Sequence, residues 1–158
     1  MTIAASVENF LNQEHVPYDL VAHRHTWNST YTAQAAHIPG DRLAKCVMLE
    51  DSQGYLMAVL PATHTVDLGA VRQQLGRPIG LATEGELAGL FLDCEPGAIP
   101  PLAQAYGVDA IVDESLLYAD DVYFEGGDHC ALVHVSGRDF RKLMGDALRG
   151  QISHQHRH

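Results

Sequence analysis

The amino-acid sequence predicts one domain of the α/β (α+β) class, with a mixed, barrel-like β-sheet surrounded by helices. Helical and strand patterns interleave along the 158 residues, which indicates helices packed on a sheet. Several of the expected strands are too close in sequence to be joined by crossover helices, so part of the sheet must be antiparallel. The two strands expected between Lys45 and Leu60 are apolar on both faces, which is typical of strands inside a sheet.

The N-terminal half contains two expected helices, one strand and one hairpin. Ile3, Val7 and Leu11 follow the spacing of one helical face, and Pro17 ends that helix. The turn residues 51–54 separate the two apolar strands of the hairpin. The expected elements are helices over about residues 2–15 and 30–37, a strand over 18–23, and hairpin strands over 45–49 and 55–60.

The C-terminal half continues with three helices and several short strands. Leu68, Val71 and Leu75 predict a helix, which Gly76 ends. The motif Thr83-Glu84-Gly85-Glu86 is typical of a capping box, so a second helix is expected to begin there. The remaining expected elements are strands over residues 78–81, 110–112, 122–124 and 131–135, and a last helix, capped by Ser136, with the apolar stripe Phe140, Leu143, Met144 and Ala147.

Residues 1–150 are expected to form this single domain. No low-complexity block, linker or fixed-period repeat divides the chain, and its length suffices for one core but not for two ordinary domains. Residues 151–158 contain His154, His156 and His158 and are expected to form a disordered tail. Neither a signal peptide nor an apolar run of roughly 20 residues is present, so a cytoplasmic protein without a membrane partner is expected.

Charge and cysteine spacing limit the classes of partner. The chain has a formal charge of -10, from 20 acidic and 10 basic side chains. Such a charge repels a long phosphate backbone, so a broad nucleic-acid groove is disfavoured and DNA is not an expected partner. Few and local contacts to the tip of a nucleic acid are compatible with this charge. Cys46, Cys94 and Cys130 are too far apart to indicate a disulfide framework or a thiolate zinc site.

Two local features could carry chemistry, since the common catalytic motifs are absent from the sequence. Lys45 is one of only two lysines and stands at the mouth of an otherwise apolar strand. A lysine at a strand end that reaches water is the alternative reading. Residues 97–101, Gly-Ala-Ile-Pro-Pro, form a rigid loop that could aim backbone N–H groups at a carbonyl or oxyanion. A plain proline-rich connection is the alternative there.

Five segments, in order along the chain, resemble the YbaK/prolyl-tRNA editing family, also called aminoacyl-tRNA deacylases or synthetase-associated domains. The resemblance extends from about Thr2 to Leu148. None of the segments is specific alone, but their common order makes coincidence improbable. They are Leu43-Ala44-Lys45-Cys46-Val47-Met48-Leu49, Val66-Asp67-Leu68, Gly97-Ala98-Ile99-Pro100-Pro101, Ile111-Val112-Asp113 and Phe124-Glu125-Gly126-Gly127.

The resemblance implies a reaction in which water attacks the ester that joins an amino acid to the terminal ribose of tRNA. It assigns Lys45 to anchoring the substrate, and Gly97 and Ala98 to holding the carbonyl through backbone donors. Ile99, Pro100 and Pro101 would then line the substrate site. No cofactor or metal is implied. The implied partner is the acceptor end of an aminoacyl-tRNA, and an aminoacyl-tRNA synthetase is a second candidate partner.

Residues 23–30 depart from the family, whose better known members carry a pocket-lining aromatic residue there. The identity of the amino acid therefore stays open. His23 and Thr26 in this segment, and His129 in the last expected hairpin, are candidate substrate contacts because functional residues concentrate in loops. Either histidine could transfer a proton to the leaving ribose oxygen. Asp128 is the nearest candidate for an acidic residue that some members place in this hairpin.

Three functions are compatible with these features. A trans-editing aminoacyl-tRNA deacylase, a hydrolase that clears mischarged tRNA, is favoured because a pure docking surface has no need of a lysine at a pocket mouth. The alternative is a non-catalytic module that binds an aminoacyl-tRNA end or a synthetase. A metal-dependent hydrolase ranks last, since the histidine spacing offers no paired ligands on one element.

Overall fold

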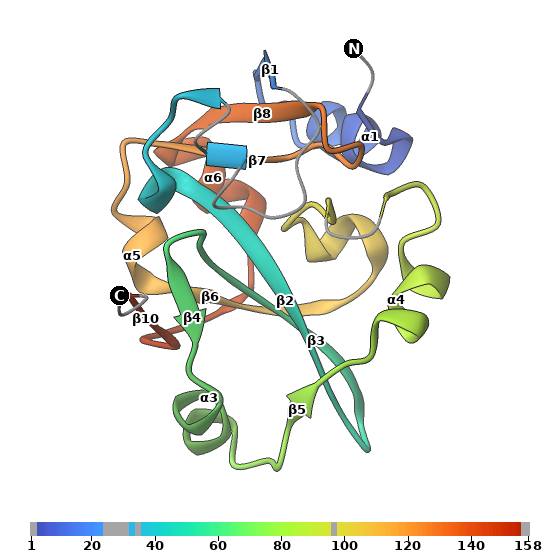
Figure 1. The fold of residues 1–158 in the computed structure, drawn as a ribbon, viewed down its shortest axis with the longest axis vertical. Helices are drawn as coiled ribbons and strands as arrows, with labels where there is room; N and C mark the ends of the chain where they lie inside the picture. Colours follow the sequence, from blue (N-terminus) through green and yellow to red (C-terminus); the bar gives the residue numbers. More distant parts are fainter. Residues whose placement is uncertain (1–2, 24–31, 34–35, 96–97, 156–158) are drawn as a thin grey trace.

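The computed structural model describes residues 3–23, 32–33, 36–95 and 98–155. These residues form a mixed eight-stranded sheet in the order β1-β8-β7-β2-β3-β6-β9, with β5 paired to β2 (Figure 1). β4 and β10 form a separate two-stranded sheet. The strands are β1 Asp19–Ala22, β2 Leu43–Asp51, β3 Gly54–Pro61, β4 His64–Val66, β5 Gly80–Leu81, β6 Asp109–Asp113, β7 Asp121–Glu125, β8 Ala131–Ser136, β9 Leu148–Gly150 and β10 Ser153–Gln155.

The pairing pattern of the main sheet confirms the predicted mixed architecture. Parallel pairs join β2 to β7, β3 to β6, and β6 to β9. Antiparallel pairs join β1 to β8, β7 to β8, and β2 to both β3 and β5. The long β2–β3 hairpin keeps register from Ala44 opposite Pro61 to Asp51 opposite Gly54. β2 extends two residues beyond each predicted end, and β3 extends one residue beyond each.

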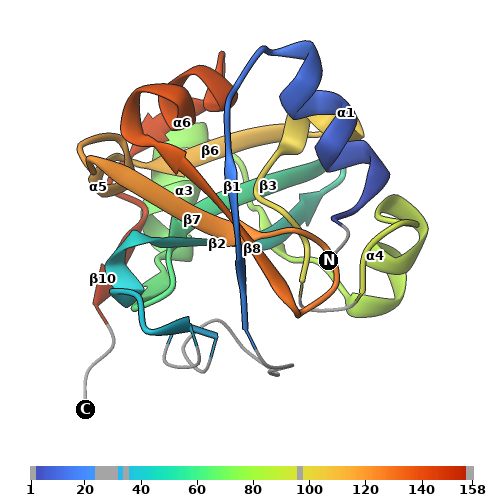
Figure 2. The ribbon, with the colours of Figure 1, turned by 90° about the horizontal axis from the view of Figure 1, so that it is seen from above.

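Helices cover both faces of this sheet (Figure 2). Residues of α1 and α6 share one apolar cluster with Val59 of β3 and Phe124 of β7. Val71 of α3 packs in a second cluster with Ala58 and Leu60, which point to the opposite face of β3. The helices are α1 Ala5–Gln13, α3 Leu68–Leu75, α4 Glu84–Leu90, α5 Glu114–Leu117 and α6 Gly137–Met144, with 3-10 turns η1 Gly40–Arg42 and η2 Ala103–Tyr106.

Of the helix ends predicted from the sequence, those at Gly76 and Ser136 form as expected and that at Thr83 does not, and Asp67 is an additional cap. The Asp67 carboxylate accepts the Ala70 N–H at 3.0 Å, and Gly76 ends α3 with a φ of 66°. Ser136 Oγ accepts the Asp139 N–H at 3.1 Å at the start of α6. The capping box of α4 is different, because the Thr83 hydroxyl donates to the Glu86 carboxylate at 2.6 Å and makes no bond to the helix backbone.

The structure corrects the expectation of a disordered tail from residue 151. Ile152 is fully buried in the second apolar cluster, and β10 pairs with β4. The Ser153 hydroxyl also donates to the Asp113 carboxylate at 2.6 Å. These contacts bury an apolar side chain and satisfy a carboxylate, so the order of residues 151–155 has a physical cause. Residues 156–158, and residues 30, 31, 34 and 35 of the helix expected over 30–37, lie outside the described residues.

The described helices include none that is long and apolar enough to cross a membrane.

Candidate functional site

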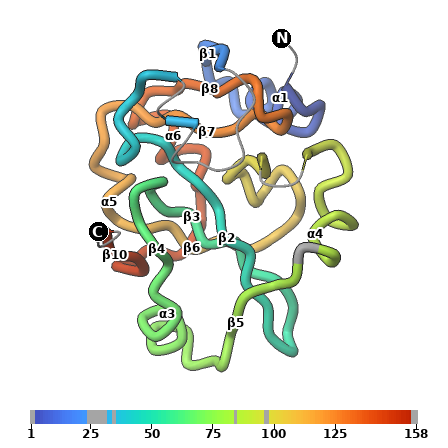
Figure 3. Tube along the Cα trace, in the orientation of Figure 1, coloured from blue at the N-terminus to red at the C-terminus, as the bar shows by residue number. Residues whose placement is uncertain are grey.

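The candidate site lies where β2 and β7 separate. The two parallel strands pair only at Leu43 with Tyr123 and at Ala44 with Phe124. Beyond this point β2 runs away from β7 and β8 toward β5, with which it pairs at Leu49 and Glu50 (Figure 3). The next residues are Lys45 on β2 and Glu125 on β7. Because side chains two residues apart share a face of a strand, Lys45 and Glu125 lie on the same face as Leu43 and Tyr123.

Lys45 is the third residue of β2 and is half-buried, so it is not a strand-end lysine with its head in water. Its Nζ donates to the Ala62 carbonyl at 3.3 Å. Burial lowers the pKa of the Lys45 ammonium below its ordinary value, because burial removes water from the charged form. A compact ammonium in this position can serve as a point charge for a phosphate or a carbonyl oxygen.

Glu125 is an acidic residue of this region, and it is buried, with only 6% of its surface exposed. Its Oε1 accepts a hydrogen bond from the Thr32 hydroxyl at 3.2 Å and lies 3.6 Å from His23 Nε2. The pKa of Glu125 is raised to about 7, and burial is the largest cause. The Thr32 hydrogen bond lowers this pKa, and the negative charge of Asp128 raises it. Near neutral pH this carboxyl group is therefore divided between its ionised and protonated forms.

Sequence reasoning missed Glu125 as a site residue. The segment Phe124-Glu125-Gly126-Gly127 contributes to the family resemblance, but Asp128 was the predicted acidic residue. The available signal was a glutamate at the end of an apolar strand, directly before two glycines.

Asp128 and the glycines build the turn between β7 and β8. One Asp128 carboxylate oxygen accepts the N–H groups of Cys130 and Ala131, at 2.9 and 3.0 Å. Gly127 has a φ of 114°, and a Cβ added there would lie 2.9 Å from the Ala4 Cβ. This Asp128 oxygen therefore fixes the turn, and the carboxylate acts on its surroundings through its charge.

The two candidate histidines lie at the same end of the sheet. His23 is buried just after β1, and its N–H donates to the Cys130 carbonyl at 2.9 Å. His129 is buried in the turn and has a φ of 61°, a conformation uncommon outside glycine. The structure thus brings His23, Glu125, Asp128 and His129 together from β1, β7 and the β7–β8 turn.

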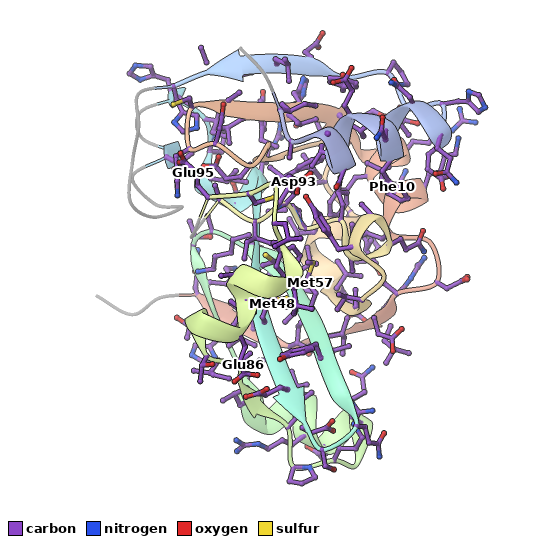
Figure 4. All side chains as sticks on the ribbon, turned by 90° about the vertical axis from the view of Figure 1, so that its right-hand side faces the viewer. Phe10, Met48, Met57, Glu86, Asp93 and Glu95 are labelled. Carbon is purple, nitrogen blue, oxygen red and sulfur yellow. The ribbon has the colours of Figure 1, made fainter. Side chains whose placement is uncertain are left out.

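The segment that carries the proline-rich loop passes beside this turn. The Glu95 N–H donates to the Gly127 carbonyl at 2.8 Å, and Figure 4 shows Asp93 and Glu95 between the β1–β8 layer and α4. Gly97 lies outside the described residues, as does Thr26. The Ala98 N–H, expected to hold a substrate carbonyl, donates instead to the Glu95 carbonyl at 3.1 Å.

The remaining loop residues are packed into the protein. Ala98, Pro100 and Pro101 are buried, and Ile99 accepts a hydrogen bond from the Cys46 thiol at 3.3 Å. Cys46 and Lys45 are neighbours on β2 and so point to opposite faces. Contact with Cys46 therefore does not place Ile99 beside the Lys45 ammonium. A common opening for Lys45 and Gly97 stays a prediction.

A cavity of about 340 Å³ lies in another part of the molecule, between β3, η2, β6 and the end of α6. Pro101 is the one expected site residue among its lining residues, which also include Gln104, Asp109 and Leu148. This cavity is separate from the candidate site. Within the described ranges, no group of three His, Cys, Asp or Glu side chains is placed to hold a metal ion.

Comparison with known proteins gives a family and a set of similar structures. The model of the "Aminoacyl-tRNA editing domain" family matches residues 23–143. Hypothetical protein APE2540 is 23% identical, with a TM-score of 0.83, over 94% of this chain and 99% of that chain. A protein described as a "putative trans-editing enzyme for prolyl tRNA synthetase" is 21% identical, with a TM-score of 0.80, over 97% of this chain and 99% of that chain.

The same fold also occurs within a longer protein, described as a "Putative signal transduction protein" from Marinobacter aquaeolei VT8. It is 22% identical, with a TM-score of 0.79, and the match covers 96% of this chain but 31% of that chain. A comparison with curated protein sequences gives no significant match. At these identities, the structural likeness confirms the fold that the sequence predicted.

Proposed function

Because the chain belongs to the aminoacyl-tRNA editing domain family, we propose that it hydrolyses the ester between an amino acid and the terminal ribose of mischarged tRNA. The observation that carries this proposal is the placement of Lys45 and Glu125 on one face where β2 and β7 separate. The Lys45 ammonium and the buried Glu125 carboxyl group belong to the residues that directly follow the last β2–β7 pair. Their ammonium and carboxylate groups form no ion pair within the described structure.

Direct attack by water fits the described side chains better than a covalent intermediate. The Cys46 thiol, next to Lys45 in the sequence, is a candidate nucleophile, but burial raises its pKa to about 12. Burial also raises the pKa of the Cys94 thiol to about 12. At neutral pH both groups are thiols and not thiolates, so they are poor nucleophiles. An activated ester needs mainly positioning and charge stabilisation, to which the substrate's own ribose hydroxyl can contribute.

Most basic side chains of the described surface are already engaged within the protein, which favours a contact with only a small part of the tRNA. Arg42 pairs with Asp121 at 2.7 Å, and Arg77 pairs with Asp51 at the same distance. Arg141 and Lys142 donate to backbone carbonyls. Few cations are therefore left for phosphates, which suits recognition of the acceptor end alone. A synthetase partner could hold the rest of the tRNA.

A deacylation screen over a panel of mischarged tRNAs tests the proposal. At least one mischarged tRNA should be hydrolysed much faster than its correctly charged counterpart. The alternative, a module that binds the aminoacyl end without hydrolysis, predicts binding to the same tRNAs and no release of amino acid above the spontaneous rate. Absence of both hydrolysis and binding across the panel would exclude a role in editing.

A further inference from the structure

Glu125 has hydrogen-bonding capacity that the described protein does not use. The side chain is 8% exposed, and its Oε1 is engaged by Thr32 and lies near His23. The other oxygen, Oε2, is buried and accepts no hydrogen bond from any described residue. An ionised carboxylate has room for about four hydrogen bonds, and leaving one oxygen without a donor after burial disfavours folding. A ligand that supplies a donor to Oε2 would remove that cost.

The surrounding charges indicate what kind of donor fits. Oε2 of an ionised carboxylate only accepts hydrogen bonds, and a cationic donor gives the strongest contact. The charge of Asp128 adds to the negative potential there, as its effect on the pKa of Glu125 shows. The nearby cation on the same face, Lys45, is engaged by the Ala62 carbonyl instead. The site thus has a positive group on the β2 side and a negative region on the β7 side.

An aminoacyl ester has the matching polarity. Its terminal phosphate and ribose lie on one side of the ester carbonyl, and its free α-ammonium group lies on the other. We propose that Glu125 binds the α-ammonium group of the aminoacyl ester, which restricts the site to esters with a free amino group. This inference rests on the proposed function and identifies the substrate class within it. N-acylated esters, such as peptidyl or formylated ones, lack the cation and would be rejected.

The test compares a mischarged tRNA found in the screen with its N-acetylated form, using wild-type protein and Glu125→Gln. Wild-type protein should prefer the free amine by about tenfold or more in kcat/KM, the scale of one hydrogen bond to a charged group. Glu125→Gln should lose about 10- to 100-fold on the free amine, mainly through KM. Its activity on the N-acetylated ester should stay within about twofold of wild type. Equal losses on both esters, or no preference in wild type, would overturn the inference.

Two further variants separate recognition from a general structural effect. Glu125→Asp keeps the charge but withdraws it by one methylene, so part of the preference should return. Glu8→Gln removes the same charge from an exposed side chain of α1 and should change neither ester's rate. If Glu125→Gln does not fold, Glu125→Asp and the wild-type preference still decide the question.

Binding measurements keep this inference distinguishable from the proposed function. The probes are 3′-aminoacylamino-3′-deoxyadenosine 5′-phosphate, in which an amide replaces the ester, and its N-acetyl derivative. Preferential binding of the free amine, lost in Glu125→Gln, supports the inference even if no tRNA is hydrolysed. Hydrolysis of tRNA without any preference for the free amine refutes the inference and leaves the proposed function standing. Failure of wild-type protein both to hydrolyse and to bind refutes both.

Discussion

At the scale of single residues, substitution of Lys45 shows whether this side chain acts in catalysis or only in the structure. If its ammonium contacts a phosphate or the aminoacyl group as the ester reacts, Lys45→Ala should lower deacylation by about a hundredfold or more. The described contact of Nζ is one bond to the Ala62 carbonyl at 3.3 Å, so the melting temperature should fall by only a few degrees. Single-turnover deacylation and thermal melts measure the two effects.

Lys45→Arg and Lys142→Ala complete that experiment. A planar guanidinium replaces a point charge in a half-buried position, so Lys45→Arg should restore only part of the rate. Lys142 lies on α6 and donates to the Glu14 carbonyl, far from the separation of β2 and β7, so its alanine variant should keep full activity. A Lys45→Ala protein with the wild-type rate would show that Lys45 takes no part in the reaction.

Glu125 should make stability depend on pH. Its pKa is raised from 4.5 to about 7 in the folded protein. Between these values the unfolded chain has released the proton and the folded protein still holds it. Stability from this group is therefore complete below about pH 4.5 and is lost as pH rises through about 7. Between these pH values the free energy of unfolding falls by about 3 kcal/mol, at 1.36 kcal/mol for each unit of the difference in pKa.

Glu125→Gln removes this dependence, because the amide does not ionise. Its melting temperature should exceed that of wild type at pH 8, and the difference should nearly vanish at pH 4.5. Calorimetry at the two pH values measures it. The comparison is between variant and wild type at each pH, so that pH effects common to both proteins cancel. A variant less stable than wild type at pH 8 would contradict the desolvation of Glu125.

The role of Glu125 shows what a sequence withholds at this scale. A glutamate at the end of a strand is usually solvated, but Glu125 is buried and accepts a hydrogen bond from Thr32, 93 residues away in the chain. Such a contact leaves no local pattern. The Asp128 bonds, by contrast, span two and three residues and are typical of aspartate in a turn. The sequence therefore already contained a reason to assign Asp128 to the turn.

At the scale of elements, two residues with the same predicted capping role should differ in their contributions. Ser136 Oγ accepts a backbone N–H of α6, whereas Thr83 makes no such bond to α4. Ser136→Ala should thus destabilise the protein by about 1 kcal/mol, and Thr83→Ala by clearly less. Urea denaturation of the two variants measures both values. Equal losses would mean that the Thr83 bond to Glu86 stabilises α4 as strongly as a cap.

The elements that sequence predicted well are those set by near neighbours. The β2–β3 hairpin follows from two apolar runs around a turn, and α3 follows from its apolar spacing and from Gly76. β10 was missed because the three histidines of residues 151–158 suggest a solvated tail. Its order comes from pairing with residues 64–66 and from the bond between Ser153 and Asp113. Neither partner can be inferred from the local composition of residues 151–158.

At the scale of the whole molecule, charge should govern the encounter with tRNA. The net charge of -10 and the engaged arginines leave few positions for phosphate binding. Binding to free tRNA should be weak, and its dependence on salt should have a slope no steeper than about -2, which corresponds to two or three phosphate contacts. Fluorescence anisotropy with labelled tRNA between 50 and 200 mM salt is the measurement. A steep slope would reveal a basic surface outside the described residues.

The pairing of β1 with β8 has a consequence for biosynthesis. Asp19 lies opposite His134, so the first strand to leave the ribosome finds its partner only after more than 100 further residues have been made. β3 likewise acquires its neighbour β6 about 50 residues later. Contacts of such long sequence separation slow folding, because the loop must close before the pairing stabilises it. Synthesis from the N-terminal side thus leaves β1 without its partner until β8 has emerged, and only then can this side of the sheet close.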